Sequence, residues 1–212
     1  MSSTVISLIS HERLNTYLKA SGFDMDRALR LYAWNMRISA SFFPLLCCIE
    51  VCLRNRIAPR LVDRFGQGWW NNEELHTIMG GKGKGTVLRT AKSINERGTQ
   101  RGTTPTSGRM TAELNFGFWV GMLLPKYETE LWDDLQTWFP DLPQDQNLSS
   151  LQQYAAEIRD LRNRISHHEP IFKRDLTLDY ARQLQFLTWT GPQKAAWIRP
   201  QLETMKILRQ RP

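Results

Sequence analysis

Four residues near the C-terminal end of the chain have the types and spacing needed to cleave a phosphodiester bond. They are Arg162, Asn163, His167 and His168, within the stretch LRNRISHHEPIF. An arginine guanidinium can grip a phosphate through two parallel hydrogen bonds and stabilise its growing negative charge. A histidine can move a proton to or from an oxygen near neutral pH. With RNA, the 2′-hydroxyl can itself attack the adjacent phosphorus, so no metal and no other cofactor is expected. Asn163 would orient the arginine or the phosphate by hydrogen bonds.

The placement of these side chains depends on where their helix ends. Apolar residues before the motif recur every three or four positions, which predicts an amphipathic helix. Pro170 disfavours helical backbone at the residue before it, so we expect the helix to end near His167 or His168. In a regular helix Arg162 and His167 point about 140° apart. A helix that frays at the histidines would let the imidazole turn toward the arginine, and the two would face one cleft.

The same residues also have a purely structural interpretation. A protonated histidine beside the last carbonyls of a helix is favourable because of the helix dipole alone. An earlier stretch, LRNRIAPR from Leu53 to Arg60, repeats the letters LRNRI but has no histidine after them. That copy can pair with acidic groups or bind phosphate, but it cannot move a proton.

A second candidate surface is the stretch from Gly80 to Thr111, where the positive charge of the chain concentrates. The whole chain has a net charge of +7 and an isoelectric point near 9.6. This stretch has seven basic residues against Glu96 alone, a local net charge of +6. A basic surface of this kind favours a polyanionic partner, RNA or DNA before a membrane. The alternative is a solvated loop without a partner. The expected RNA-binding residues are Lys82, Lys84, Arg89, Lys92 and, in the histidine motif, Arg164.

The chain is expected to be all-α, because its apolar residues follow helical spacing and no stretch alternates at period two. We expect one domain over residues 1–212, a helical bundle with a basic Gly/Thr-rich loop or insertion at about 80–111. Within that insertion only 87–96 has a helical pattern, and the rest is typical of a loop. The expected caps and breaks are Ser10 and Asp24 as N-caps, Pro44 as a kink or division, and Ser149 or Ser150 as the cap of the motif helix.

Cysteine usage and hydropathy favour a cytoplasmic protein without a membrane span. Cys47, Cys48 and Cys52 lie within six residues and have no histidine nearby, so we expect buried reduced thiols and no metal site. The longest apolar stretch, residues 38–53, is broken by Pro44 and Glu50 and is shorter than the roughly 20 residues that cross a bilayer. The N-terminal residues lack a basic leader, which argues against a secretory signal.

The stretch LRNRISHHEPIF resembles the signature of the Abi-like proteins, the abortive-infection group of the HEPN superfamily. Further pieces fit the same family: ALRLYAWNMRISASFF, CIEVCLRNRI, FGQGWW, AELNFGFWVGML and YETELW. The resemblance extends from about Arg13 to Trp197. It implies an α-helical bundle and, in active members, a metal-independent endoribonuclease that dimerises so that two motifs form one cleft.

The resemblance also implies residue roles. The motif arginine corresponds to Arg162, the polar residue after it to Asn163, and the histidine to His167, with His168 also at a permitted spacing. Family members are associated with phage defence and with toxin–antitoxin-like systems. We therefore expect a phage-defence effector or toxin that acts on RNA as a homodimer, with an antitoxin or regulatory protein as a further partner. The alternative is a non-catalytic RNA-binding or toxin–antitoxin partner module on the same scaffold.

Overall fold

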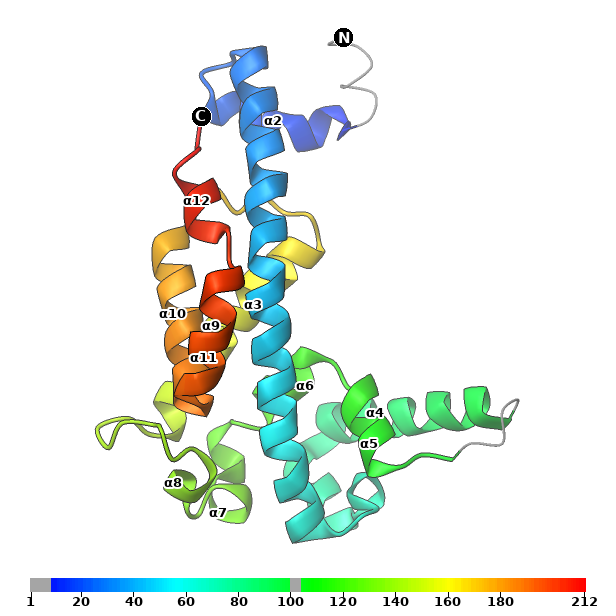
Figure 1. Ribbon diagram of the computed structural model, residues 1–212. Coiled ribbons are helices and arrows are strands. Elements are labelled where there is room, and N and C mark those ends of the chain that lie inside the picture. The colour runs from blue at the N-terminus through cyan, green and yellow to red at the C-terminus, as the bar shows by residue number, and fades with distance from the viewer. Residues whose placement is uncertain (1–8, 100–103) are drawn as a thin grey trace.

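The computed structural model describes residues 9–99 and 104–212, and these ranges form helices and connecting loops without a strand (Figure 1). This confirms the predicted all-α fold. The α-helices are α2 (His11–Ala20), α3 (Met25–Phe65), α4 (Glu73–Thr99), α5 (Ser107–Glu113), α6 (Phe116–Gly121), α7 (Glu128–Leu131), α8 (Leu135–Trp138), α9 (Leu148–Ser166), α10 (Leu176–Thr190), α11 (Pro192–Ile198) and α12 (Thr204–Leu208). Short 3-10 helices are η1 (Trp69–Asn71), η2 (Pro125–Tyr127) and η3 (Arg199–Gln201).

The longest of these helices, α3, forms the axis of the fold (Figure 1). It begins after Asp24, whose side chain accepts a backbone N–H of the first turn, and it ends at Gly66 with a φ of 82°. Pro44 does not divide the helix, contrary to one of the two expectations for it. Near this proline, which cannot donate a backbone hydrogen bond, the Thr204 hydroxyl donates to the Ser41 carbonyl at 3.0 Å. This bond holds α12 against the proline turn.

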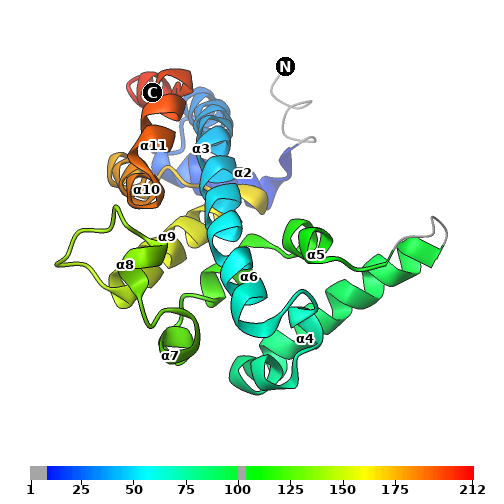
Figure 2. The same cartoon turned by 60° about the horizontal axis from the view of Figure 1, so that its bottom comes forward.

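Most of the other helices pack along α3 (Figures 1 and 2). Helices α2, α10 and α12 contact its N-terminal and middle parts, while α5, α6 and α7 lie near its C-terminal end. The core between them is dominated by large side chains. The largest of those fully buried are Trp69, Trp119, Tyr17, Phe42, Phe116, Phe139 and Phe186. Burial on this scale supplies most of the free energy of folding.

Within the basic stretch 80–111, residues 80–99 and 107–111 are helical and 104–106 are not. The helix expected over 87–96 is confirmed, and the loop prediction was wrong for the helical residues on either side of it. Helix α4 runs from Glu73 to Thr99 through the letters GKGKG, with a kink at Gly80 where φ is 69°. After the kink, Val87, Ala91 and Ile94 are buried at helical spacing. Burial of this stripe outweighs the weak helix propensity of the glycines. Figure 2 shows the end of α4 reaching away from the other helices.

One side of α3 carries an exposed apolar stripe, made of Met36, Ala40, Phe43, Cys47 and Val51. Their spacing of three or four residues places them within about 80° of one another around the helix. The side chain of Phe43 is 63% exposed. The exposure of Cys47 corrects the expectation that all three cysteines are buried; Cys48 and Cys52 are half-buried.

By length and composition, α3 is also apolar enough to cross a membrane. Its most apolar window of 18 residues has a mean hydropathy of 1.7, and 33% of that window is buried. The core helix of a soluble protein passes the same test. In this fold the opposite side of α3 is buried against the helices around it.

Candidate functional site

Helix α9 carries the motif, and its buried stripe fixes which way each motif residue points. Leu151, Ala155, Ile158 and Leu161 are buried at spacings of three or four residues. The helix is capped by the Asn147 side chain, which accepts the Ser150 N–H at 3.0 Å, and not by a serine as expected. Arg162 and Asn163 are half-buried on the flanks of the stripe, whereas Arg164 and both histidines are exposed.

The helix ends in a hydrogen-bonded turn rather than by fraying. The His168 N–H donates to the Ile165 carbonyl at 3.0 Å, and the Glu169 N–H donates to the Arg164 carbonyl at 2.8 Å. This is the bond pattern of a Schellman motif, whose turn residue adopts left-handed backbone. Here that residue is His168, with a φ of 55°. An ion pair of 3.4 Å between Arg164 and Glu169 lies across the same turn.

Two contacts from distant segments anchor this turn. The Arg13 guanidinium of α2 donates to the His168 carbonyl at 3.3 Å. The side-chain oxygen of Asn35, buried in α3, accepts the Ile171 N–H at 2.9 Å and the Phe172 N–H at 3.2 Å. Asn35 was not identified from the sequence. The available signal was a single amide within the apolar pattern YAWNMRIS.

The two proposed catalytic side chains are not in contact within one chain. His167 has φ and ψ of −90° and 9°, and its N–H still donates to the Asn163 carbonyl at 2.9 Å. It therefore continues the helical direction, on the same side as Asn163 and about 140° from Arg162. No hydrogen bond or ion pair joins Arg162 to either histidine among the described residues. The expectation that α9 frays at the histidines, and so lets an imidazole turn toward Arg162, was wrong.

The positive charge of Arg162 acts on the exposed apolar stripe of α3. Partial burial and the Glu50 carboxylate raise the pKa of the Cys47 thiol, and the charge of Arg162 opposes that rise. A raised pKa keeps this exposed thiol protonated and weakly nucleophilic at neutral pH.

Of the five expected RNA-binding residues, Arg164 belongs to α9 and the other four are spread along α4. One of those four lies near the motif. Lys82 and Asn163 line a common cavity of about 630 Å³ between α4, α6 and α9. The other candidates do not line it. Lys84 pairs with Glu73 at 3.4 Å, Lys92 pairs with Glu96 at 3.8 Å, and the Arg89 guanidinium donates to the Thr86 hydroxyl at 3.4 Å.

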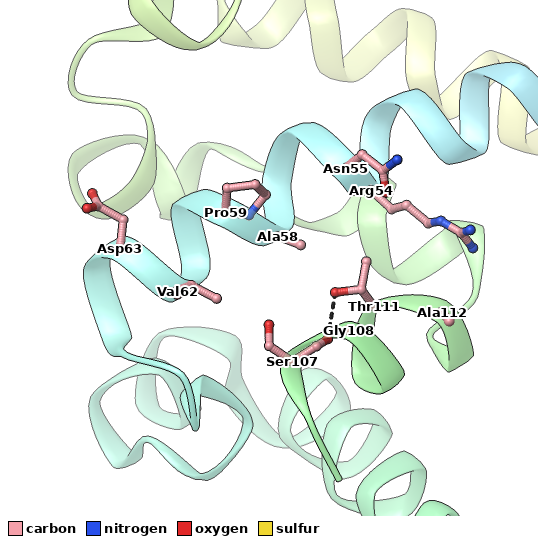
Figure 3. Close-up of a pocket in the computed structure, with 10 residues that line it drawn as sticks. All are labelled: Arg54, Asn55, Ala58, Pro59, Val62, Asp63, Ser107, Gly108, Thr111 and Ala112. Atoms are coloured by element: carbon pink, nitrogen blue, oxygen red, sulfur yellow. Dashed lines mark hydrogen bonds between the residues drawn. The ribbon is translucent and has the colours of Figure 1, made fainter.

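The earlier LRNRI copy has a different environment, at a cavity of about 610 Å³ between α3 and α5 (Figure 3). Arg54 and Asn55 line it from α3, and Ser107, Gly108 and Thr111 line it from α5. The next arginine, Arg56, donates to the Thr190 carbonyl at 2.6 Å and so ties α3 to the end of α10. The earlier copy thus helps to hold α3 against α10, whereas the later copy is followed by two exposed histidines.

Within the described ranges, no group of three or more His, Cys, Asp or Glu side chains is placed to hold a metal ion. The candidate site consists of an arginine and an amide near the end of α9 and two imidazoles in the turn that follows it. Such groups can bind a phosphate and transfer protons.

The sequence model of the Abi-like protein family matches residues 6–173. That range contains α2 and α3, the whole motif and the anchored residues Ile171 and Phe172. No curated protein and no solved structure matches the chain. The match covers well over half of the 212 residues and suggests a function in abortive infection. The chain belongs to the Abi-like protein family.

Proposed function

We propose that this protein is a metal-independent endoribonuclease of abortive infection, acting in the cytoplasm as a phage-defence effector or toxin. The observation that supports it best is the anchored turn at the end of α9. This turn holds His167 in solvent, one helical turn beyond Asn163, with Arg162 half-buried beside α3. A fixed proton carrier and a phosphate-binding arginine are the two groups that RNA cleavage requires.

The reaction needs two proton transfers and stabilisation of charge. A base removes the proton of the 2′-hydroxyl, whose oxygen attacks the adjacent phosphorus. The 5′-oxygen of the next nucleotide leaves with its bonding electrons and takes a proton from an acid. The products are a 2′,3′-cyclic phosphate and a 5′-hydroxyl. Arg162 would neutralise the phosphorane oxygens, and His167 would serve as base or acid.

A second copy of the chain would complete this site. One chain offers one arginine at the stripe and one His167 directed elsewhere, so acid and base are not both present beside Arg162. We propose that the exposed stripe of α3 packs against its own copy around a two-fold axis. Burying Met36, Phe43 and Val51 in both chains supplies the apolar contact that such a face needs to offset the repulsion between like charges.

In the proposed dimer the two-fold axis would pass through the centre of the stripe. The stripe runs from Met36 to Val51, so its midpoint lies between Phe43 and Pro44. Cys47 is then about 5 Å from the axis along α3, by 1.5 Å per residue. The charge of Arg162 acts on Cys47, so such a dimer would bring the two copies of Arg162 toward one another, and the two chains together would offer two arginines and two histidines to one RNA.

The dimer is tested by placing a charge in the stripe. Phe43→Asp should convert the dimer to a monomer in analytical ultracentrifugation and reduce RNA cleavage. Trp197→Asp is the matched control, because Trp197 is 67% exposed and lies outside the stripe. A wild-type protein that sediments as a monomer at assay concentrations and cleaves RNA fully would exclude the dimer.

The second candidate function is a non-catalytic RNA-binding module that acts with an antitoxin or regulatory protein. It is favoured by the exposed basic side chains of α4 and by the lack of contact between Arg162 and His167 in one chain. The two functions differ in chemistry. Purified protein should cleave total RNA in EDTA and leave cyclic-phosphate ends, whereas a His167→Ala/His168→Ala variant should bind RNA without cleaving it. Binding without cleavage by the wild type would favour the second function.

A further inference from the structure

The cavity between α4, α6 and α9 has the size and lining of a ligand site. Its volume of about 630 Å³ lies in the range of small-molecule pockets. We propose that it holds one nucleotide of the RNA, next to the phosphate that is cleaved. This inference rests on the proposed ribonuclease function and adds to it a subsite that positions the substrate.

The charges around the cavity favour a phosphate. Lys82 of α4, Lys126 of η2 and Arg159 of α9 contribute three positive charges to its wall. Asp160 is the one acidic side chain among the described lining residues, and it pairs with Arg159 at 2.9 Å. Lys82 has no ion pair within the described part of the chain and is exposed, so its ammonium group is available to a ligand.

The remaining lining favours a nucleotide over a bare anion. The wall also contains the apolar side chain of Leu124, which is 38% exposed, together with the buried side chains of Phe118, Met122 and Tyr127. Two amides, Asn115 and Asn163, lie among them, and the Asn163 side chain makes no hydrogen bond with any described residue. Apolar surface can take the face of a base, and a free amide offers a donor and an acceptor to its edge.

The direction of α9 links the cavity to the proton carrier. Arg159, Asn163 and His167 follow one another at intervals of four residues, and each is rotated by about 40° from the one before. Arg159 and Asn163 line the cavity, and His167 is exposed one turn beyond, about 6 Å along the helix. A nucleotide in the cavity would therefore direct its adjoining phosphate toward His167.

Backbone features keep the cavity open. An added Cβ at Gly121 of α6 would meet no atom within 4 Å, so a side chain there would extend into free space. Across the cavity, the Lys126 ammonium donates to the Met79 carbonyl at 2.6 Å, just before the kink at Gly80. This bond fixes the direction in which α4 continues, and with it the position of Lys82.

The test fills the cavity without touching the motif. Gly121→Leu should obstruct it, and Gly108→Leu is the matched control, since Gly108 also has open space around its Cβ but lines the cavity of Figure 3. The probe is a short single-stranded RNA with every 2′-hydroxyl methylated, which cannot be cleaved. Its dissociation constant is measured by fluorescence anisotropy, with thermal melting of each variant to establish that it is folded. Gly121→Leu should weaken binding roughly tenfold or more, and Gly108→Leu should not.

A second substitution keeps the test decisive if Gly121→Leu does not fold. Lys82→Ala, at an exposed side chain, should then weaken binding of the same probe, by roughly threefold to tenfold. Unchanged binding by a folded Gly121→Leu protein, or by Lys82→Ala in its place, would overturn the subsite. The ribonuclease proposal fails separately: if binding depends on the cavity but unmodified RNA stays intact with the wild type, the cavity binds RNA and the protein is not a nuclease.

Discussion

Replacing Asn35 by alanine should loosen the turn that carries the histidines and destabilise the whole fold. The Asn35 side-chain oxygen accepts two buried backbone N–H groups, from Ile171 and Phe172, which follow the motif directly. Alanine leaves both donors without a partner. A buried unpaired donor costs about 1–3 kcal/mol, and the site lies close enough to the exposed turn for partial hydration. We therefore expect a loss of about 2–4 kcal/mol in the free energy of unfolding.

Urea denaturation followed by circular dichroism measures this loss as a shift in midpoint without a change in slope. Amide hydrogen exchange should show lost protection at Ile171 and Phe172 in particular. Asn55→Ala is the matched control, because Asn55 is exposed on the same helix and makes no hydrogen bond with the described residues. Its effect should stay within about 0.5 kcal/mol. An Asn35→Ala protein as stable as this control would refute the anchoring role.

Three further predictions concern the turn, the core and the basic helix. Because His168 has left-handed backbone and His167 does not, His168→Gly should be more stable than His168→Ala by about 1 kcal/mol, with the opposite order at position 167, in thermal or urea unfolding. Burial raises the pKa of Tyr17 and of Tyr127 from 10.0 to about 12. The folded state thus favours the neutral phenols, so stability should be full below pH 10.0 and fall as the pH rises toward about 12, less steeply in Tyr17→Phe; a flat profile would contradict this. The third change neutralises four basic residues of α4 together, namely Lys82, Lys84, Arg89 and Lys92. It should weaken RNA binding at low salt and reduce the slope of log affinity against log salt by up to about 3. An unchanged slope would show that α4 does not contact the RNA.

Local patterns in the sequence predicted the helices that carry the motif. The apolar stripe of α9 appears in its spacing, and Pro170 correctly indicated that the helix ends at the histidines. Ser10 and Asp24 were correctly identified as caps, because capping depends on side chains a few residues away.

Features that depend on contacts between distant segments could not be predicted from local sequence patterns. The bonds from Asn35 join residues that are 136 and 137 positions apart, and nothing near Pro170 indicates that partner. The glycines of GKGKG predicted a loop, but the burial of Val87 and Ile94 against other elements extends a helix through them. The left-handed backbone of His168 was also missed, because glycine is the usual residue at that position of a turn.

The most direct test of the proposed site is the single-turnover rate of RNA cleavage in EDTA by the wild type, Arg162→Ala and His167→Ala. Neither side chain belongs to the buried stripe of α9, so both variants should keep the wild-type circular dichroism spectrum and melting temperature. Losing the proton carrier should lower the rate by roughly 10²–10⁴, and Arg162→Ala should lower it comparably by removing the stabilisation of phosphorane charge. A folded His167→Ala or Arg162→Ala protein that cleaves RNA at the wild-type rate would contradict the assignment.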